Sequence, residues 1–226
     1  MDDTISSKIQ KKSDRKTKSK AAIKRILATL DALYPFDGIC FLNHQTPWQL
    51  LFATILSAQC TDDRVNLVTA SLFNDYPDLE SYVSAPITDL EKAVHSTGFY
   101  RAKARHLQES AKKLLTDFDG VLPSEIDQLT SLSGVGRKTA NVVRSHIFKI
   151  PSIVVDTHVR RISNKLGLSH HADPEKIEYD LMQILPQSHW IRYNQQVITH
   201  GRRVCISSRP QCHECQLIKD CENPKS

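Results

Sequence analysis

The sequence predicts an all-α protein, because apolar residues recur at helical spacing, glycine is scarce, and no segment alternates like a β-strand. Only seven of the 226 residues are glycine, about 3% where proteins usually have about 7%. Long glycine-free stretches carry apolar side chains every three or four residues, which is the period of one helix face. A chain of this length forms one or two domains and can bury an ample core.

Two of the predicted helix faces are regular enough to name. One runs through Ile23, Ile26, Leu27, Leu30 and Leu33, and the other lies within residues 50–58. Glycine weakens a helix interior, so we expect the glycines at boundaries between helices. These boundary positions are Gly38, Gly98, Gly120, Gly134, Gly136, Gly167 and Gly201.

The first 20 residues are basic and predict a disordered tail. They hold seven Lys or Arg and three Asp, with few large apolar side chains, so they cannot bury a core of their own. Such a tail either contacts a phosphate backbone or only aids solubility, and the net charge of +5 is mild. The segment lacks the apolar region of a secretory signal, and no run of about 18 apolar residues could span a membrane. We expect a soluble protein in the cytoplasm, associated with the nucleoid if the source is prokaryotic.

Residues 124–148 predict two helices joined by a tight turn. Ser124 is the expected N-cap of the first helix, and the turn contains Gly134 and Gly136. Glycine lets the backbone approach a ligand closely, and free amides at the start of the second helix suit a phosphate oxygen. An ordinary corner between two helices would have the same pattern, so the turn alone does not establish a DNA contact.

Four cysteines lie within the last 22 residues, separated by six, two and five residues: Cys205, Cys212, Cys215 and Cys221. Thiolates at this density are metal ligands or disulfides, and a chain with an ample core needs no disulfides. Tetrahedral zinc takes four thiolates, and a [4Fe-4S] cluster takes one thiolate per iron. Zinc sites usually have two separate short Cys pairs, whereas this chain has one pair inside a compact loop. The spacing therefore favours the cluster over zinc.

Several motifs together resemble the endonuclease III-type DNA glycosylases of the helix–hairpin–helix superfamily. The resemblance covers residues 21–222 and includes LLFATILSAQCTDDRVN (50–66), TGFYRAKA (97–104), LSGVGRKTANVV (132–143), VDTHVRR (155–161) and the terminal cysteine loop (200–221). It implies a six-helix lobe at residues 40–150 and an iron–sulfur lobe from residues 21–39 with 151–226. Double-stranded DNA with damaged bases or abasic sites would lie across the cleft between the lobes.

The resemblance assigns the chemistry to Lys138 and Asp156, which would face each other from the two lobes. Lys138 would attack the sugar of an extruded base and form a Schiff base. The start of a helix disfavours added positive charge, which suits an amine that must be neutral to attack. Asp156 would accept a proton or stabilise positive charge on the ribose, and it is also an expected N-cap. The implied activity is removal of oxidised pyrimidines followed by β-elimination at the abasic site.

Other residues are expected to hold DNA. Gln59 would fill the space left by the extruded nucleotide, and Phe99 would intercalate where many relatives carry leucine, which leaves the preference for the opposite base open. The turn glycines Gly134 and Gly136 and the adjacent Arg137 would bind phosphate, as would Arg209 between the first two cluster cysteines. For Gln59 and Arg209 the alternative is an ordinary solvated side chain.

Two alternative functions stay open at this point. A monofunctional mismatch glycosylase of the same superfamily would typically lack lysine at position 138 and carry a further C-terminal domain. A non-enzymatic DNA-binding module stapled by zinc would explain the hairpin and the cysteines but not the pairing of Lys138 with Asp156. We expect a monomeric DNA glycosylase and AP lyase.

Overall fold

A computed structural model describes residues 18–36, 38 and 40–224, and in these residues every regular element is a helix. The predicted all-α class is therefore confirmed. The chain divides into two compact units, one of residues 39–150 and one of the residues before 39 together with those after 150. Along the described chain, no helix is both long and apolar enough to cross a membrane.

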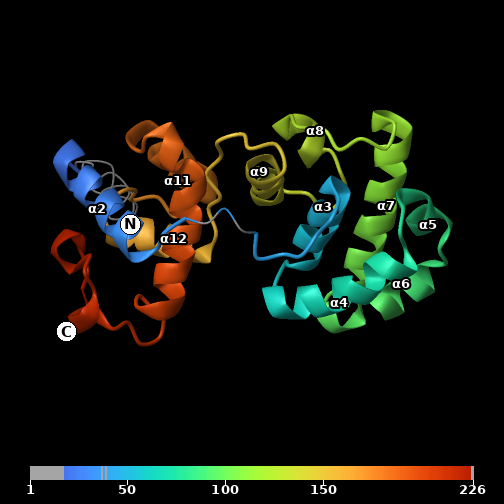
Figure 1. Ribbon diagram of the computed structural model, residues 1–226, viewed down its shortest axis with the longest axis horizontal. Coiled ribbons are helices and arrows are strands. Elements are labelled where there is room, and N and C mark those ends of the chain that lie inside the picture. The colour runs from blue at the N-terminus through green and yellow to red at the C-terminus, as the bar shows by residue number, and fades with distance from the viewer. Residues whose placement is uncertain (1–17, 37, 39, 225–226) are drawn as a thin grey trace, which may run out of the picture. The chain divides into compact units, whose positions relative to one another are not determined.

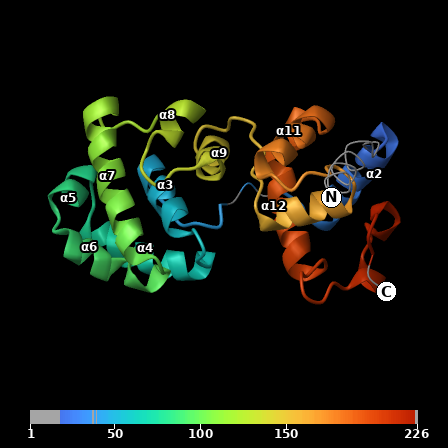
Figure 2. The same ribbon diagram turned by 180° about the vertical axis from the view of Figure 1, so that it is seen from behind.

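The unit of residues 39–150 contains seven α-helices in its described part, one more than the resemblance implied. They are α3 (Pro47–Leu56), α4 (Asp62–Asp75), α5 (Leu79–Ser84), α6 (Ile87–Ala93), α7 (Tyr100–Phe118), α8 (Ile126–Thr130) and α9 (Arg137–His146), with a 3-10 turn, η1 (His95–Thr97). The long helix α7 packs beside α5 and α6, as both faces of the molecule show (Figures 1 and 2). Helix α3 is buried along almost its whole length and contacts α4, α7 and α9, so it forms the centre of this unit.

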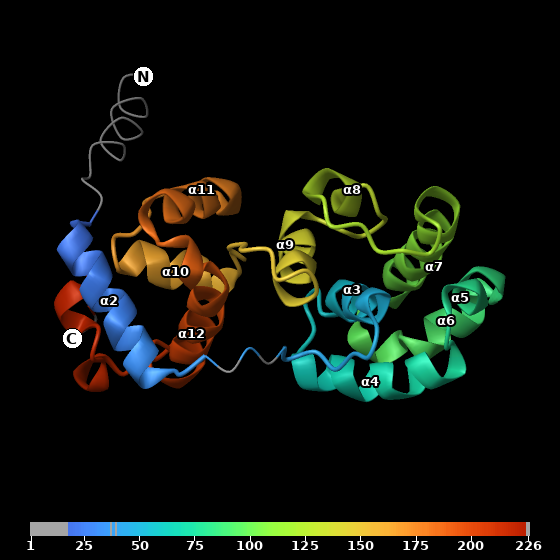
Figure 3. The same ribbon diagram turned by 45° about the horizontal axis from the view of Figure 1, so that its top comes forward.

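The other unit brings α2 (Lys20–Leu33) together with three helices from the second half of the chain. These are α10 (Thr157–Lys165), α11 (Pro174–Ile184) and α12 (Trp190–Arg203). Helix α12 contacts both α2 and α10 (Figure 3). Three short 3-10 turns, η2 (Gln187–His189), η3 (Cys212–Glu214) and η4 (Ile218–Asp220), complete the described part of this unit. Apolar residues of α2 share one core with those of α10, α11 and α12, so the expected face from Ile23 to Leu30 is buried here.

Side-chain caps fix where many of these helices begin. Ser19, Thr61 and Asp78 accept hydrogen bonds from backbone N–H groups in the first turns of α2, α4 and α5. Thr46 and Gln49 form a reciprocal capping box at α3. Each cap satisfies an amide that has no partner within its helix, and such a cap typically contributes about 1 kcal/mol.

Two expectations about helix ends were wrong, and one segment lies mostly outside the described residues. Helix α8 begins at Ile126 behind Glu125, so the expected N-cap Ser124 was wrong; its hydroxyl contacts the Glu125 carboxylate instead. Gly201 lies inside α12, not at a helix boundary. The basic tail lies outside the described residues as far as position 17, whereas Ser19 caps α2 and Lys20 is its first residue.

Candidate functional site

The hairpin between α8 and α9 is a tight turn built around one buried side chain. Gly134 adopts φ of 73°, a left-handed conformation that suits glycine. The next residue, Val135, buries its side chain and donates its N–H to Leu132 O at 3.2 Å. Gly136 then occupies the N-cap position of α9, where no side chain caps the helix. The turn thus presents a helix start whose amides suit an anionic ligand.

Helix α7 holds this hairpin through Ser133. The Ser133 carbonyl accepts a hydrogen bond from Ser110 Oγ at 2.8 Å, and the Ser133 hydroxyl donates to Glu109 Oε2 at 2.6 Å. The His106 ring lies 2.9 Å from the same hydroxyl through Nδ1. The position of the turn is therefore set by a helix that lies distant in sequence.

Lys138 is exposed in the first turn of α9. The opposite face of the helix, with Ala140 and Val143, is buried in the core. The lysine thus projects from a fixed helix close to the uncapped amides of the hairpin.

Asp156 is the N-cap of α10, as expected from the sequence. Its Oδ1 accepts a hydrogen bond from Val159 N at 2.8 Å, and the carboxylate is half-buried. The preceding residues Ile153, Val154 and Val155 are buried, which anchors the chain as it enters the helix. Lys138 and Asp156 belong to different units, so their facing each other stays a prediction.

Close packing of α10 against α12 also fixes the start of α10. Gly201 of α12 lies so near His158 that an added Cβ would overlap the ring, and it would lie 3.1 Å from Ile162 Cδ1. Burial lowers the pKa of His158, and the nearby Arg161 and Arg202 lower it further, while Asp156 acts in the opposite direction. His158 is thus a packing residue between Asp156 and α12.

Gln59 and Phe99 share an unusual backbone conformation. Their φ angles are 54° and 49°, in the left-handed region that non-glycine residues seldom adopt. Both side chains are exposed, and Phe99 exposes 67% of its surface. Such strain at exposed residues is typical of functional positions. Both residues lie in the unit that contains the hairpin.

The four C-terminal cysteines line one small cavity, together with Lys165, Val204 and Ile218 among others. Arg161 Nη1 donates to Cys205 Sγ at 3.2 Å, and His200 Nε2 lies 3.7 Å from Cys215 Sγ. Burial raises the pKa of the Cys215 thiol, and the other three cysteines raise it further. Within the described residues, no three Cys, His, Asp or Glu side chains are arranged to hold a single metal ion. The four thiols nevertheless line one cavity, and thiolates gathered in this way can bind zinc or an iron–sulfur cluster. Arg209 is exposed in the same loop.

Comparison with known proteins identifies the family. The model of the HhH-GPD superfamily of base excision DNA repair proteins matches residues 52–187. The chain is 45% identical to the endonuclease III of Synechocystis sp. over 98% of this chain and 100% of that protein. It is 42% identical to the endonuclease III of Bacillus subtilis over 80% of this chain and 84% of the relative.

The chain belongs to the endonuclease III family. It is a base excision repair enzyme with DNA glycosylase and AP lyase activity. A solved endonuclease III trapped as a covalent intermediate with DNA is similar in structure, with a TM-score of 0.86 and 40% identity over 91% of this chain and 96% of that one. A non-covalent complex of an endonuclease III with DNA matches equally well.

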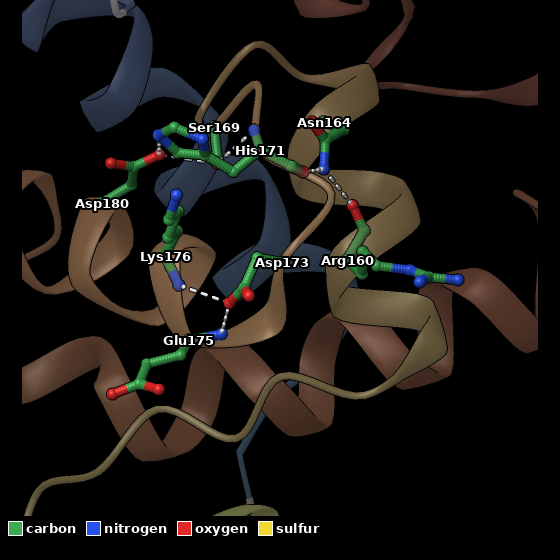
Figure 4. Close-up of polar contacts among 8 residues, drawn as sticks. All are labelled: Arg160, Asn164, Ser169, His171, Asp173, Glu175, Lys176 and Asp180. Atoms are coloured by element: carbon green, nitrogen blue, oxygen red, sulfur yellow. Dashed lines mark hydrogen bonds and ion pairs between the residues drawn. The ribbon is translucent and has the colours of Figure 1, made fainter.

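This member of the endonuclease III family also has a basic hollow that the sequence did not predict. Arg160, Arg161, Lys165, His170 and His171 line it, together with Asn164, Ala172 and Asn223. Figure 4 shows how its edge is held: Asn164 Nδ2 donates to the carbonyls of Arg160 and His171, while Ser169 Oγ donates to Asp180. Asp173 caps α11 beside it. At this edge the Asp180 carboxylate accepts from the loop and the Asp173 carboxylate accepts from the first turn of α11.

A second residue missed from the sequence is Lys103, which is 3% exposed in α7. Its position on the apolar stripe with Leu107 and Leu114 was the available signal, because a lysine on a buried helix face needs polar partners. Nothing in the sequence, however, indicates which carbonyl groups those partners are.

Proposed function

We propose that this enzyme removes oxidised pyrimidines from double-stranded DNA and cleaves the resulting abasic site through a Schiff base on Lys138. The observation that carries the proposal is an exposed lysine in the first turn of an uncapped helix, directly after a glycine hairpin. The DNA adduct of a 40% identical endonuclease III supports a covalent step.

Lys138 would act as the nucleophile. Its neutral amine attacks the sugar carbon and displaces the damaged base, which leaves an imine on the opened sugar. The imine acidifies the neighbouring carbon, so that loss of a proton there expels the 3′ phosphate and nicks the strand. Hydrolysis of the imine then frees the lysine.

Asp156 would assist base release. Its Oδ1 is engaged by the Val159 N–H, and this bond fixes the carboxylate at the start of α10. A carboxylate held in this way stabilises positive charge that develops on the ribose as the bond to the base breaks. It can also take the proton that the Lys138 amine loses after attack.

The hairpin and two exposed side chains would hold the distorted DNA. Backbone amides after Gly134 and Gly136, with Arg137, would bind one phosphate and carry no sequence information. Phe99 would enter the base stack as an aromatic wedge, and Gln59 would fill the space of the extruded nucleotide. Arg209 would add a phosphate contact from the cysteine loop.

Cys205, Cys212, Cys215 and Cys221 would hold a [4Fe-4S] cluster. When bound, the cluster supplies four thiolate bonds that close the C-terminal loop. The Arg161 N–H directed at Cys205 Sγ would stabilise a thiolate there. We further propose that the enzyme works as a monomer in the cytoplasm, as expected of a repair enzyme that acts on cellular DNA.

Borohydride trapping on duplexes with single lesions tests the proposal. Thymine glycol, dihydrouracil and hydroxycytosine duplexes form the substrate panel. Borohydride reduces the imine, so the wild type should become covalently attached to DNA. Lys138→Gln lacks the amine, and both adduct and strand cleavage should vanish while binding to an abasic site is retained. Asp156→Asn should slow base release.

Lys112→Gln is the matched control, because Lys112 is exposed on α7 of the same unit. It should form the adduct like the wild type. An adduct formed by Lys138→Gln would assign the chemistry to another amine. Base release that continues in Lys138→Gln without strand cleavage would show that Lys138 is needed for the lyase step but not for displacement of the base.

A further inference from the structure

We propose that buried Lys103 is a positioning residue that ties together the two loops carrying Gln59 and Phe99, so that both side chains enter DNA as one unit. The proposal rests on the proposed function, in which these residues occupy the space left by an extruded nucleotide. Lys103 itself lies inside the protein and does not touch DNA.

The first contact of Lys103 lies directly before the α3–α4 loop (residues 57–61). Lys103 Nζ donates to the carbonyl of Leu56, the last residue of α3, at 2.8 Å. Just beyond it, Cys60 N donates to Ser57 O at 3.1 Å and closes the turn that contains Gln59. The lysine therefore fixes the point from which this turn leaves the helix.

The second contact lies directly before the η1–α7 loop (residues 98–99). Lys103 Nζ also donates to Thr97 O at 2.8 Å, and the backbone N–H of the same lysine donates to Phe99 O at 3.1 Å. The side chain thus holds this loop from the residue before Gly98, which has φ of 73°, whereas the backbone bond to Phe99 is the first helical hydrogen bond of α7. One side chain links carbonyls that lie 41 residues apart in sequence.

Both held loops contain a strained residue. Gln59 and Phe99 each adopt a left-handed conformation, and each exposes its side chain. A non-glycine residue keeps this conformation only where the surrounding structure enforces it. One ammonium group binds the carbonyls directly before both loops and so provides such a constraint at the two positions together.

Burying an ammonium group costs free energy, so a lysine at this position indicates a role that an apolar side chain could not perform. Burial lowers the pKa of Lys103, because the charged form loses its water. Two carbonyls and the C-terminal end of the α3 dipole compensate the charge. Methionine would fill the same volume without this cost, but it would leave the Leu56 and Thr97 carbonyls without their donor.

The test compares one lesion in two settings. A dihydrouracil is placed in a fully paired duplex and in a small mismatched bubble, where extrusion costs less. Single-turnover base release is measured for both, with 2-aminopurine fluorescence beside the lesion to follow unstacking. Lys103→Met should slow release from the paired duplex roughly 10- to 100-fold more than from the bubble. Equal losses on both substrates, or no loss, would overturn the proposal.

Gln108→Met is the matched control. Gln108 also lies on α7 and donates from Nε2 to two carbonyls, of Tyr82 and Ala85, but these belong to α5 and its end. This variant should keep the wild-type ratio of the base-release rate on the paired duplex to the rate on the bubble. If this rate ratio falls as far as in Lys103→Met, then loss of any side-chain hydrogen bond from α7 is sufficient to explain the effect.

A double-mutant cycle tests the link to the exposed side chain. If Lys103 acts through Phe99, adding Phe99→Ala to Lys103→Met should slow base release little beyond the effect of Lys103→Met alone. Fully additive losses would overturn the link. If Lys103→Met does not fold, Lys103→Gln keeps a donor and serves in the same comparison. A wild type inactive on both substrates would contradict the proposed function, whereas an active wild type with an unchanged Lys103 variant would contradict this inference alone.

Discussion

The change Gly134→Ala tests the hairpin most directly, because two separate effects oppose a side chain there. Gly134 has φ of 73°, and a Cβ built on it would lie 2.7 Å from Cγ and 2.9 Å from Cβ of His106. These two atoms attach the His106 ring to the backbone of α7, and the ring nitrogen also contacts Ser133 Oγ. The neighbour therefore cannot move aside by a simple rotation.

The size of the effect follows from these two terms. A left-handed conformation costs a non-glycine residue about 1–2 kcal/mol, and forcing atoms into a packed site costs about 1–3 kcal/mol. Replacing glycine also lowers the entropy of the unfolded chain, which returns about 0.4–1 kcal/mol. We expect a net loss of about 2–4 kcal/mol in the free energy of unfolding.

Thermal unfolding and DNA binding measure this loss. For a protein of this size, about 2–4 kcal/mol should lower Tm by roughly 5–15 °C. Fluorescence anisotropy with an abasic-site duplex should show weaker binding, because the turn whose amides we propose to bind phosphate is displaced.

Gly136→Ala is the internal control for this prediction. Gly136 has φ of −91°, and no heavy atom lies within 4 Å of a Cβ built there. Alanine is only a poorer N-cap than glycine, so the change should cost about 0.5–1 kcal/mol. A Gly134→Ala protein as stable as Gly136→Ala would refute the described packing of the turn.

Three further predictions concern DNA, the cysteine loop and α10. Gly136→Asp should place a carboxylate where we propose that a phosphate binds, and so weaken DNA binding by a similar factor on all sequences. Unchanged affinity for abasic-site DNA in anisotropy would contradict the hairpin assignment. Cys212→Ala should remove iron and the visible absorbance and weaken DNA binding, whereas wild-type protein that contains one zinc and no iron would contradict the cluster. Gly201→Ala should lose about 1–2 kcal/mol in chemical denaturation, because overlap with His158 outweighs the gain in helix propensity. The same change should slow base release by displacing the start of α10 and Asp156, and an unaltered rate would show that this packing does not position the carboxylate.

The sequence by itself determined the features that are encoded within a few neighbouring residues. The spacing from Ile23 to Leu30 predicted a buried helix face, and the structure confirms it in α2. Asp156 was recognised as an N-cap because a short acidic side chain stood before a helical pattern. The glycine turn and the dense cysteines were equally local, since each depends on spacing along a single segment.

Local sequence signals gave wrong expectations in two situations. In one, a neighbouring residue began the helix instead; in the other, a distant helix determined the residue type. Ser124 is a good capping residue, yet α8 starts two residues later and leaves its hydroxyl beside Glu125. Gly201 was expected at a boundary, because sequence alone shows only that glycine weakens a helix. Its actual position inside α12 is explained by His158 on α10, which lies 43 residues earlier in the chain and leaves no room for a Cβ.

Only the tertiary structure decided how the exposed residues are held. The motif around Gln59 and the motif around Phe99 were each visible in the sequence, but the left-handed backbone of both residues was not. Neither residue is glycine, so local propensity opposes the conformation and packing must impose it. Lys103 reaches the carbonyls next to both loops, and such a contact depends on the three-dimensional approach of α3, η1 and α7. Helical period, capping and ligand spacing act over short windows of sequence, whereas the close approach of distant segments is fixed only when the core packs.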